Sequence, residues 1–187
     1  AWGFLTERLG IDPARLYPTI YLDDDEAFEL WQEVVGVPAE KIARLGKKDN
    51  FWSMGDVGPC GPCSEIMYDR GREFCTCGRE DCGPEVECER WWELWNLVFM
   101  QFEQQADGAM TPLPRPSIDT GAGLERLTAV LQGYDSNYKS DLFMPIIRRT
   151  QELLGHSDAQ REEQIVAYRV IADHGRAITF LVGDGVL

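Results

Sequence analysis

The sequence lacks the features that would place it in a membrane or along nucleic acid. It has no apolar run of the roughly eighteen residues that a membrane-spanning helix needs, and no basic-then-apolar leader is visible. Basic residues are few: 18 Lys and Arg stand against 32 Asp and Glu, for a net charge of −14. Because neutralising phosphates requires clustered Lys and Arg, this charge argues against a broad nucleic-acid surface. We expect a soluble cytoplasmic domain with no membrane or DNA partner, whose acidity mainly serves solubility.

An initiator Met and a polar C-terminal tail are also missing. The chain opens in a helical pattern at Ala1 and stops soon after an apolar helical stretch, at Leu187. We therefore expect both ends to be interruptions of a longer protein. The length of 187 residues and the 44% hydrophobic content suit one domain with its own core.

Six cysteines are present, without the secretory signal that usually accompanies a disulfide framework. Four lie in a glycine- and proline-containing insert at about residues 72–90, namely Cys75, Cys77, Cys82 and Cys88. Such an insert cannot build a core of its own, so a tetrahedral zinc site would explain how it folds. The Cys-x-Cys pairing is less usual than Cys-x2-Cys, which leaves Cys60 and Cys63 as alternative ligands or as free thiols.

The first half of the chain alternates strand and helix signals. Residues 18–22 have the composition of a short strand, and Asp23 or Asp24 is positioned to cap a helix that ends at Gly36. Residues 55–63 are rich in glycine and proline and are interpreted as a rigid loop, followed by a strand over 64–69. A loop of this kind is either part of a ligand pocket or a structural corner.

Residues 91–102 are long and aromatic, which indicates a central strand buried on both faces. Period-two geometry puts Asn96 and Val98 on one side and Glu93 on the other. A polar side chain among large apolar ones is costly unless it is paired, so each is either satisfied within the fold or kept for a ligand.

The segment 117–127, SIDTGAGLERL, predicts a strand that runs through Gly121 and Gly123 into a helix. Parity aligns Asp119 with Gly121, and a carboxylate there suits a ligand ammonium group. Arg126 at the start of the helix offers a fork for phosphate oxygens. A close-packed joint between strand and helix explains the two glycines equally well. Two more helices are expected over 141–154 and 165–182, and His174 on the latter is more typical of an exposed helix residue than of a catalyst.

At this point the residues carry a resemblance. The segment 117–127 resembles the third signature motif of class II aminoacyl-tRNA synthetases in its alanyl form, and residues 50–66 and 95–102 look like alanyl-specific stretches. Residues 169–174 are similar to the opening of that family's helical tRNA-recognition region. Together these stretches cover nearly the whole chain in the order of the family.

The resemblance implies an α/β (α+β) fold, with a class II antiparallel sheet flanked by helices. It implies a partial catalytic domain over residues 1–135, including the cysteine insert, and a helical segment over 136–187 that leads into the tRNA-recognition region. The implied activity is ATP-dependent activation of L-alanine, with Mg²⁺, and transfer of the alanyl group to tRNA(Ala). No protein nucleophile is needed, because positioning and electrostatics carry such a reaction.

The resemblance also implies roles for particular residues. Asp119 would bind the alanine ammonium, and the small side-chain pocket and its polar edge would come from Trp52, Asn96, Val98 and Gly121. ATP would contact Arg126, through the γ-phosphate, and Gly123. Glu93 resembles a metal-bridging acid of the class, although parity puts it on the face opposite Asn96.

The first two signature motifs and the editing domain of the family have no counterpart in this sequence. We therefore expect the 187-residue chain alone to be inactive in aminoacylation. Two other interpretations remain at this stage. One is a non-catalytic synthetase-like paralogue that binds nucleotide, amino acid or a partner protein, and the other is a zinc-stabilised interaction module.

Overall fold

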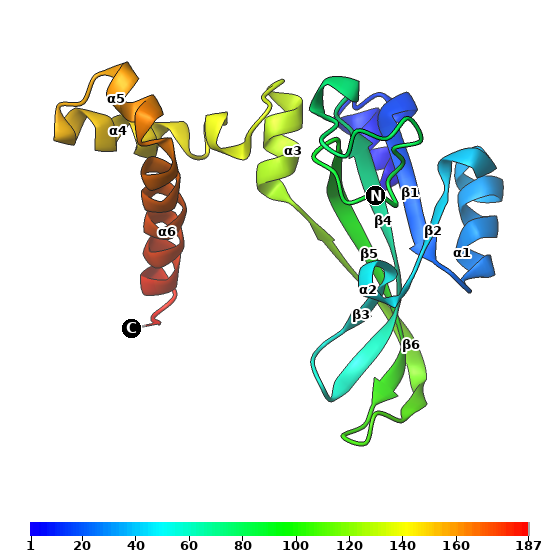
Figure 1. The fold of residues 1–187 in the computed structure, drawn as a ribbon. Helices are drawn as coiled ribbons and strands as arrows, with labels where there is room; N and C mark the ends of the chain where they lie inside the picture. Colours follow the sequence, from blue (N-terminus) through cyan, green and yellow to red (C-terminus); the bar gives the residue numbers. More distant parts are fainter. Residues whose placement is uncertain (187) are drawn as a thin grey trace. The chain divides into compact units, whose positions relative to one another are not determined.

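The structure is a computed structural model that describes residues 1–186. The chain forms two compact units, Ala1–Gly123 and Leu124–Leu187 (Figure 1). The boundary expected after residue 135 separates the catalytic domain of the family from its helical region, whereas the division at Gly123 separates compact units. The boundary at residue 135 stays a prediction.

The first unit is built on a six-stranded sheet. Its strands are β1 (Leu16–Tyr21), β2 (Ala43–Leu45), β3 (Phe51–Ser53), β4 (Gly58–Asp69), β5 (Trp91–Gln104) and β6 (Met110–Ala122). They are ordered β2-β1-β4-β5-β6, with β3 added on β4, and only the β1–β2 pair is parallel. The expected α/β fold with a largely antiparallel sheet flanked by helices is confirmed.

One face of this sheet is covered by the helix that the sequence predicted after residue 24. The side chain of Asp24 accepts a hydrogen bond from the Ala27 amide at 2.9 Å and caps α1 (Asp25–Leu30), which continues as a π-helical turn to Val35. Gly36 ends it with φ of 81°, which a glycine adopts without strain. The buried Trp31 indole donates to the Ser64 hydroxyl at 2.8 Å, which ties this helix to β4. We call this side of the sheet the Trp31 face.

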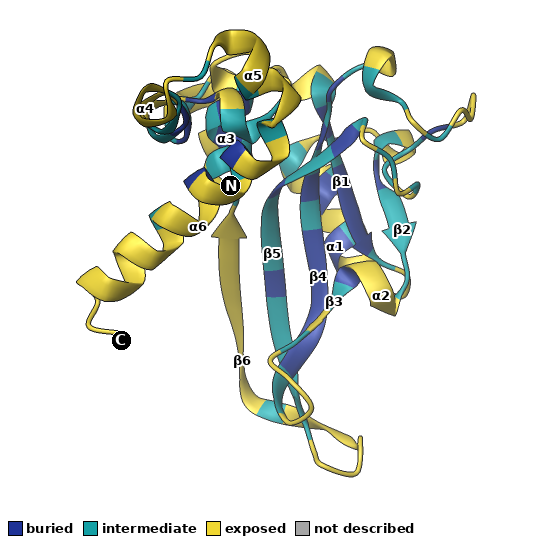
Figure 2. Ribbon diagram, turned by 60° about the vertical axis from the view of Figure 1, so that its left-hand side comes forward, coloured by how far each residue is buried: buried dark blue, intermediate teal, exposed yellow. Residues whose placement is uncertain are grey.

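Two expectations about the strands were wrong. The Gly/Pro-rich stretch forms a loop only up to Val57, because residues from Gly58 onward already pair with β5. The strand β5 is not buried on both faces, since most of its side chains are half-exposed and its outer neighbour β6 is exposed along almost its whole length (Figure 2). The sheet is therefore open at its β6 edge, where a ligand can approach.

Short helical segments complete the first unit: a π-helical turn at Phe4–Arg8, 3₁₀ turns at Pro13–Arg15, Ala39–Lys41 and Arg72–Phe74, and the short helix α2 (Lys47–Asn50). The second unit is helical, with α3 (Leu124–Leu131), a 3₁₀ turn at Asn137–Lys139, α4 (Met144–Leu154), α5 (Asp158–Glu163) and α6 (Ile165–Gly183).

The core of the second unit lies between α4 and α6. It consists of Phe143, Ile147, Tyr168 and Ala172, against which further apolar side chains pack. Ser157 caps α5 with a reciprocal capping box, as a serine three residues before a glutamine predicts. Within residues 1–186, no helix is both long and apolar enough to span a membrane.

Candidate active site

The strand registers bring three cross-strand rows together on the side of the sheet opposite the Trp31 face, which we call the Asn96 face. Residues paired directly across neighbouring strands project on the same side. The middle row runs from Thr19 through Glu65 and Asn96 to Gly121. On one side of it lies the row Cys63, Val98 and Asp119, and on the other the row Tyr17, Met67 and Glu93. The sequence-derived grouping of Asn96 with Val98 and of Asp119 with Gly121 is thus the grouping that the register produces.

Glu93 lies on this same Asn96 face, contrary to the parity argument. A bulge shifts the β4–β5 register between Ile66 and Met67, so that Met67 pairs with Glu93 while Ile66 pairs with Trp95. One extra residue on β5, Leu94, breaks the alternation and reverses the side on which Glu93 projects. The Glu93 charge also helps to raise the pKa of the Cys63 thiol, as expected for groups on one face.

The amide of Asn96 is held at one end and unpaired at the other. Its Nδ2 donates to Glu65 Oε1 at 3.2 Å, whereas its buried carbonyl oxygen Oδ1 has no hydrogen-bond partner. Asn50, at the end of α2, presents the same pattern: its Nδ2 donates to Thr19 Oγ1 and to the Cys63 carbonyl, and its Oδ1 is unpaired. A buried acceptor without a donor costs about 1–3 kcal/mol, which a ligand donor would offset.

Asp119 and Gly121 lie on the exposed edge strand β6. The Asp119 carboxylate accepts only a local bond from the Thr120 amide, at 2.9 Å, among the hydrogen bonds described for it. A Cβ added at Gly121 would meet no heavy atom within 4 Å, so packing does not explain the glycine. Trp52 is 36% exposed and pairs with Gly61, two residues before Cys63 on β4, at the border of the same face.

The electrostatic character of the Asn96 face is negative. The pKa of the buried Cys63 thiol is raised to about 12, first by burial and then by the neighbouring Glu65 charge. Burial likewise raises the pKa of Cys60. Both thiols are therefore protonated and inert near neutral pH, and the carboxylates of Glu65, Glu93 and Asp119 leave the face suited to a cationic group.

The residues predicted to contact ATP are divided between the two units. Gly123 ends the first unit, where its amide donates to the Leu94 carbonyl at 3.0 Å. Arg126 is half-buried on α3 in the second unit. Its neighbour Glu125 accepts from Arg176 of α6 at 2.7 Å, which fixes α3 against α6. His174 on α6 is exposed, as expected of a non-catalytic histidine.

The four cysteines of the insert form a cluster. The sulfur atoms of Cys75, Cys77, Cys82 and Cys88 all lie within 4.8 Å of one another, with 3.5 Å between Cys75 and Cys77 and 3.9 Å between Cys75 and Cys88. A disulfide needs about 2.05 Å, and all six cysteines are free. Four thiolates at about 2.3 Å from one zinc ion in a tetrahedron are about 3.8 Å apart, so this donor set fits zinc.

The thiols of the cluster differ in acidity. The pKa of Cys88 is lowered to about 5, mainly by the hydrogen bond from the Arg90 backbone and also by hydrogen bonds from Thr76. That of Cys82 is raised to about 12 by burial and by the adjacent thiols.

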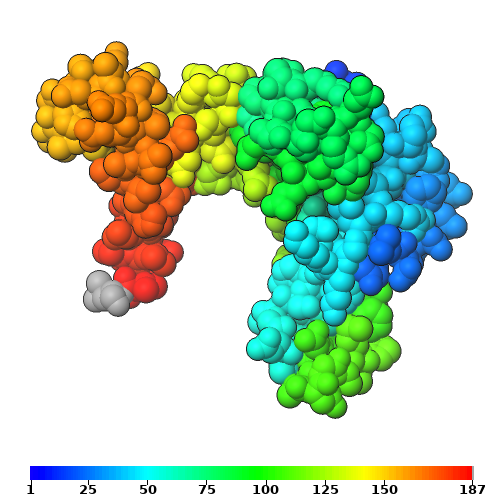
Figure 3. Space-filling view, viewed as in Figure 1, coloured from blue at the N-terminus to red at the C-terminus, as the bar shows by residue number. Residues whose placement is uncertain are grey.

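Ion pairs and stacked rings join the insert to the ends of β4 and β5. Arg90 donates through Nε to the Asp69 carboxylate at 2.7 Å, and the Arg70 guanidinium lies 4.1 Å and 4.0 Å from the ring centroids of Phe74 and Trp92. In the space-filling view the insert, in green, forms a rounded projection (Figure 3). The cluster thus closes the connection between two strands that carry the Asn96 face.

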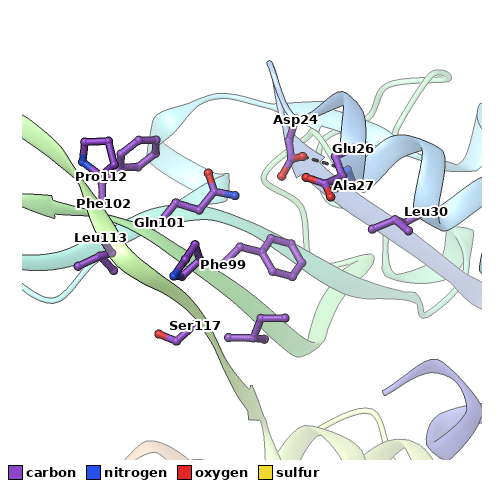
Figure 4. A pocket seen from close by; sticks show the side chains of 12 residues that line it. Asp24, Glu26, Ala27, Leu30, Phe99, Gln101, Phe102, Pro112, Leu113 and Ser117 are labelled. Atoms are coloured by element: carbon purple, nitrogen blue, oxygen red, sulfur yellow. Dashed lines mark hydrogen bonds between the residues drawn. The ribbon is translucent and has the colours of Figure 1, made fainter.

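A cavity of about 620 Å³ lies on the Trp31 face, where α1 meets the far halves of β5 and β6 (Figure 4). It is mostly apolar, with Asp24 and Glu26 at its α1 side and Phe99 and Ile118 among its lining residues. None of the alanine, ATP or metal ligands predicted from the sequence lines it. The cavity is therefore separate from the candidate site.

Sequence reasoning missed two functional candidates, Glu65 and Asn50. Both belong to the stretch that carried the family resemblance, but no role was derived for them. For Glu65 a signal existed, because alternation along β4 puts it beside Cys63 and across from the strand that carries Asn96. For Asn50 no local signal existed, since its burial depends on β1 and β4 packing under α2.

The fold and this face define the class of protein. The chain belongs to the class II tRNA synthetases: the family described as "tRNA synthetases class II (A)" matches residues 1–187. More particularly, it is similar to alanine–tRNA ligases. It is 53% identical to that of Desulfosudis oleivorans over 187 residues and 57% identical to that of Oleidesulfovibrio alaskensis over 189 residues. The enzyme of Nitratidesulfovibrio vulgaris is 56% identical over 188 residues.

Each match covers 100% of this chain but only 21% of the relative. The chain thus spans about a fifth of the length of the curated relatives that it matches.

Proposed function

We propose that the protein of which this chain is a part is an ATP-dependent alanine–tRNA ligase of the cytoplasm, and that the Asn96 face binds L-alanine. In the first step the alanine carboxylate attacks the ATP α-phosphate, which gives alanyl adenylate and pyrophosphate. In the second step a terminal ribose hydroxyl of tRNA(Ala) takes the alanyl group and AMP leaves. Nothing in this chain needs to act as a nucleophile.

The observation that carries the proposal is the meeting of an exposed carboxylate, an unpaired buried amide oxygen and an unfilled glycine position on one face. Asp119 supplies a negative charge for the substrate ammonium, and Gly121 beside it leaves open space. Val98, paired with Asp119, provides a small apolar contact of the size that a methyl side chain needs. Asn96 and Trp52 would complete the edge of this pocket.

ATP and Mg²⁺ would involve other residues. We propose that Arg126 binds the γ-phosphate, because a guanidinium fork matches phosphate oxygens, and that the Gly123 backbone permits close approach of the nucleotide. Glu93, now on the Asn96 face, is proposed as a carboxylate ligand of Mg²⁺, which prefers oxygen donors.

The test uses the full-length protein that contains this segment. Alanine-dependent exchange of pyrophosphate into ATP is measured for the wild type and for Asp119→Asn, a variant of equal size that removes only the charge. We expect exchange in the wild type and a large rise of the alanine KM in the variant, with the ATP KM little changed. A wild type that binds an alanyl-adenylate analogue but shows no exchange would instead support a non-catalytic synthetase-like protein.

We also propose that Cys75, Cys77, Cys82 and Cys88 bind one structural Zn²⁺. The support is the mutual approach of the four sulfurs within 4.8 Å in an insert with little apolar core of its own. When bound, the ion would hold together a segment that otherwise depends on a few ion pairs. This site would be closed, with all four positions filled by protein, so its role is in folding rather than in the reaction.

Zinc content distinguishes this site from other thiols. The full-length protein, purified without chelator, is compared with Cys75→Ser/Cys77→Ser and with Cys60→Ala as the matched control. We expect the double variant to contain one equivalent less zinc and the control to match the wild type. Loss of the equivalent on Cys60→Ala, or equal zinc in all three proteins, would contradict the assignment.

A further inference from the structure

The carboxylate of Glu65 accepts a hydrogen bond from the side chain of Asn96, which also interacts with the Cys63 thiol on the same face. The two residues face each other across β4 and β5, and Asn96 Nδ2 donates to Glu65 Oε1 at 3.2 Å. Glu65 occupies the middle of the row that ends at Gly121, with Thr19 on its other side. The Glu65 side chain is half-buried, and partial burial of a carboxylate lowers the stability of the fold unless the charge is paired or hydrogen-bonded.

An asparagine amide offers two different ends, and a partner that only accepts selects between them. An ionised carboxylate has no hydrogen to donate, so it can bond only to the NH₂ end of Asn96. The oxygen end is then directed away from Glu65, and it is this oxygen that is buried without a partner. A neutral partner such as glutamine would accept either orientation, because it can both donate and accept.

We propose that Glu65 is a positioning residue that fixes the Asn96 amide so that its carbonyl oxygen, rather than its NH₂ group, is offered to the amino group of the bound amino acid. This inference rests on the proposed alanine site. The substrate ammonium has three donors, and Asp119 at the exposed edge satisfies some of them. Asn96, which pairs with Gly121 one row away, supplies an acceptor from the sheet itself. Glu65 does not touch the substrate and acts only through Asn96.

The hydrogen-bonding groups of Glu65 and Asn96 can be exchanged between the two positions, and a purely structural role of Glu65 does not predict that this exchange restores activity. Glu65→Gln keeps the size of the side chain but lets the Asn96 amide turn over. Asn96→Asp places two carboxylates against each other. In the double variant the introduced glutamine donates to one oxygen of the introduced aspartate, and the second oxygen is again offered to the ligand. The geometry of the wild type is restored with donor and acceptor exchanged between the strands.

The experiment measures alanine-dependent pyrophosphate exchange by the full-length protein. Glu65→Gln should raise the alanine KM about tenfold and leave the ATP KM unchanged, as expected for loss of one oriented hydrogen bond. Asn96→Asp should lower kcat/KM for alanine by roughly a hundredfold, and the double variant should recover at least about tenfold of that loss. Glu103→Gln, on the distant end of β5, is the control and should match the wild type.

Several results would overturn the proposal. One is a double variant no better than the product of the two single effects. Another is a Glu65→Gln variant whose alanine and ATP KM values rise together, which would indicate general damage to the fold. If Asn96→Asp does not fold, the comparison of Glu65→Gln with the control still decides. A wild type without alanine-dependent exchange would contradict the proposed function itself, before any variant is compared.

Discussion

Two glycines of the sheet, Gly61 on β4 and Gly121 on β6, should respond in opposite ways to the addition of one methyl group. A Cβ at Gly61 would lie 2.0 Å from the Phe99 carbonyl oxygen and 3.0 Å from the Gln101 amide nitrogen. Both atoms belong to the backbone of β5, so neither can move without breaking the pairing of β4 with β5. A Cβ at Gly121 would meet nothing within 4 Å. The first glycine is required by the fold, and the second is not.

The magnitudes follow from these contacts. Gly61→Ala forces the strands apart by more than an ångström and should lower the free energy of unfolding by about 3 kcal/mol or more. Gly121→Ala should leave the stability unchanged or raise it by about 0.5–1 kcal/mol, because alanine loses less backbone entropy in a strand. If the space above Gly121 receives the substrate methyl group, the added carbon costs about 1–3 kcal/mol of binding, or roughly a 5- to 150-fold rise in alanine KM.

The assays are thermal or denaturant unfolding and alanine-dependent pyrophosphate exchange, both on the full-length protein. The expected outcome is a stable Gly121→Ala protein with weakened alanine binding and an unchanged ATP KM, beside a poorly folded Gly61→Ala protein. A Gly121→Ala variant with wild-type kinetics would refute the placement of the substrate side chain over this residue. A fully stable Gly61→Ala variant would refute the described approach of β4 to β5.

Four further predictions follow from other parts of the chain. Asp119→Asn should raise the alanine KM about a hundredfold or more in the exchange assay, because a charged hydrogen bond to the ammonium is lost. Chelation of zinc should lower the thermal midpoint of the wild type, and Cys82→Ser should melt at a lower temperature than the untreated wild type. A melting curve unaffected by chelator would count against a structural ion. Gly175→Ala on α6, where an added Cβ meets nothing within 4 Å, should stabilise the protein by about 1 kcal/mol in denaturant unfolding. Burial raises the pKa of Asp69, but the hydrogen bonds from Arg90 and the Gly71 amide and the nearby positive charges outweigh it, so the pKa is lowered in the folded protein. The ionised carboxylate therefore stabilises the fold above the pKa of the unfolded state, and this stabilisation is lost as the pH falls through the pKa of the folded state. Asp69→Asn should reduce this loss of stability in acid, measured as the free energy of unfolding against pH.

Much of the local structure was predictable because it depends on neighbouring residues alone. The Asp24 cap and the terminating Gly36 define α1 and its π-helical continuation, and the strand through Gly121 leads into α3 as its pattern indicates. The grouping of Asn96 with Val98 on β5, and of Asp119 with Gly121 on β6, followed from period-two alternation, since no register shift lies within either pair. Alternation failed for Glu93, only a few residues away, because the extra residue Leu94 interrupts it.

The burial of the strands was harder to predict from the sequence. A long aromatic strand is typical of a sheet centre, yet β5 lies next to the exposed edge strand β6, and most of its side chains stay half-exposed. Composition describes what a strand prefers to bury, whereas the layers that are present decide what it does bury.

The sequence by itself determined the family, the cap and the end of the helix between Asp24 and Gly36, the cysteine insert and the identity of the amino-acid pocket candidates, since these depend on residue order and on short-range geometry. Only the tertiary structure decided which side of the sheet Glu93 occupies, that Glu65 holds Asn96, and that four cysteine sulfurs converge within 4.8 Å. The physical reason is that the register between strands sets which distant residues face one another, and a single bulge reverses the side on which the following side chains project. Alternation along one strand indicates neither the register nor the bulge.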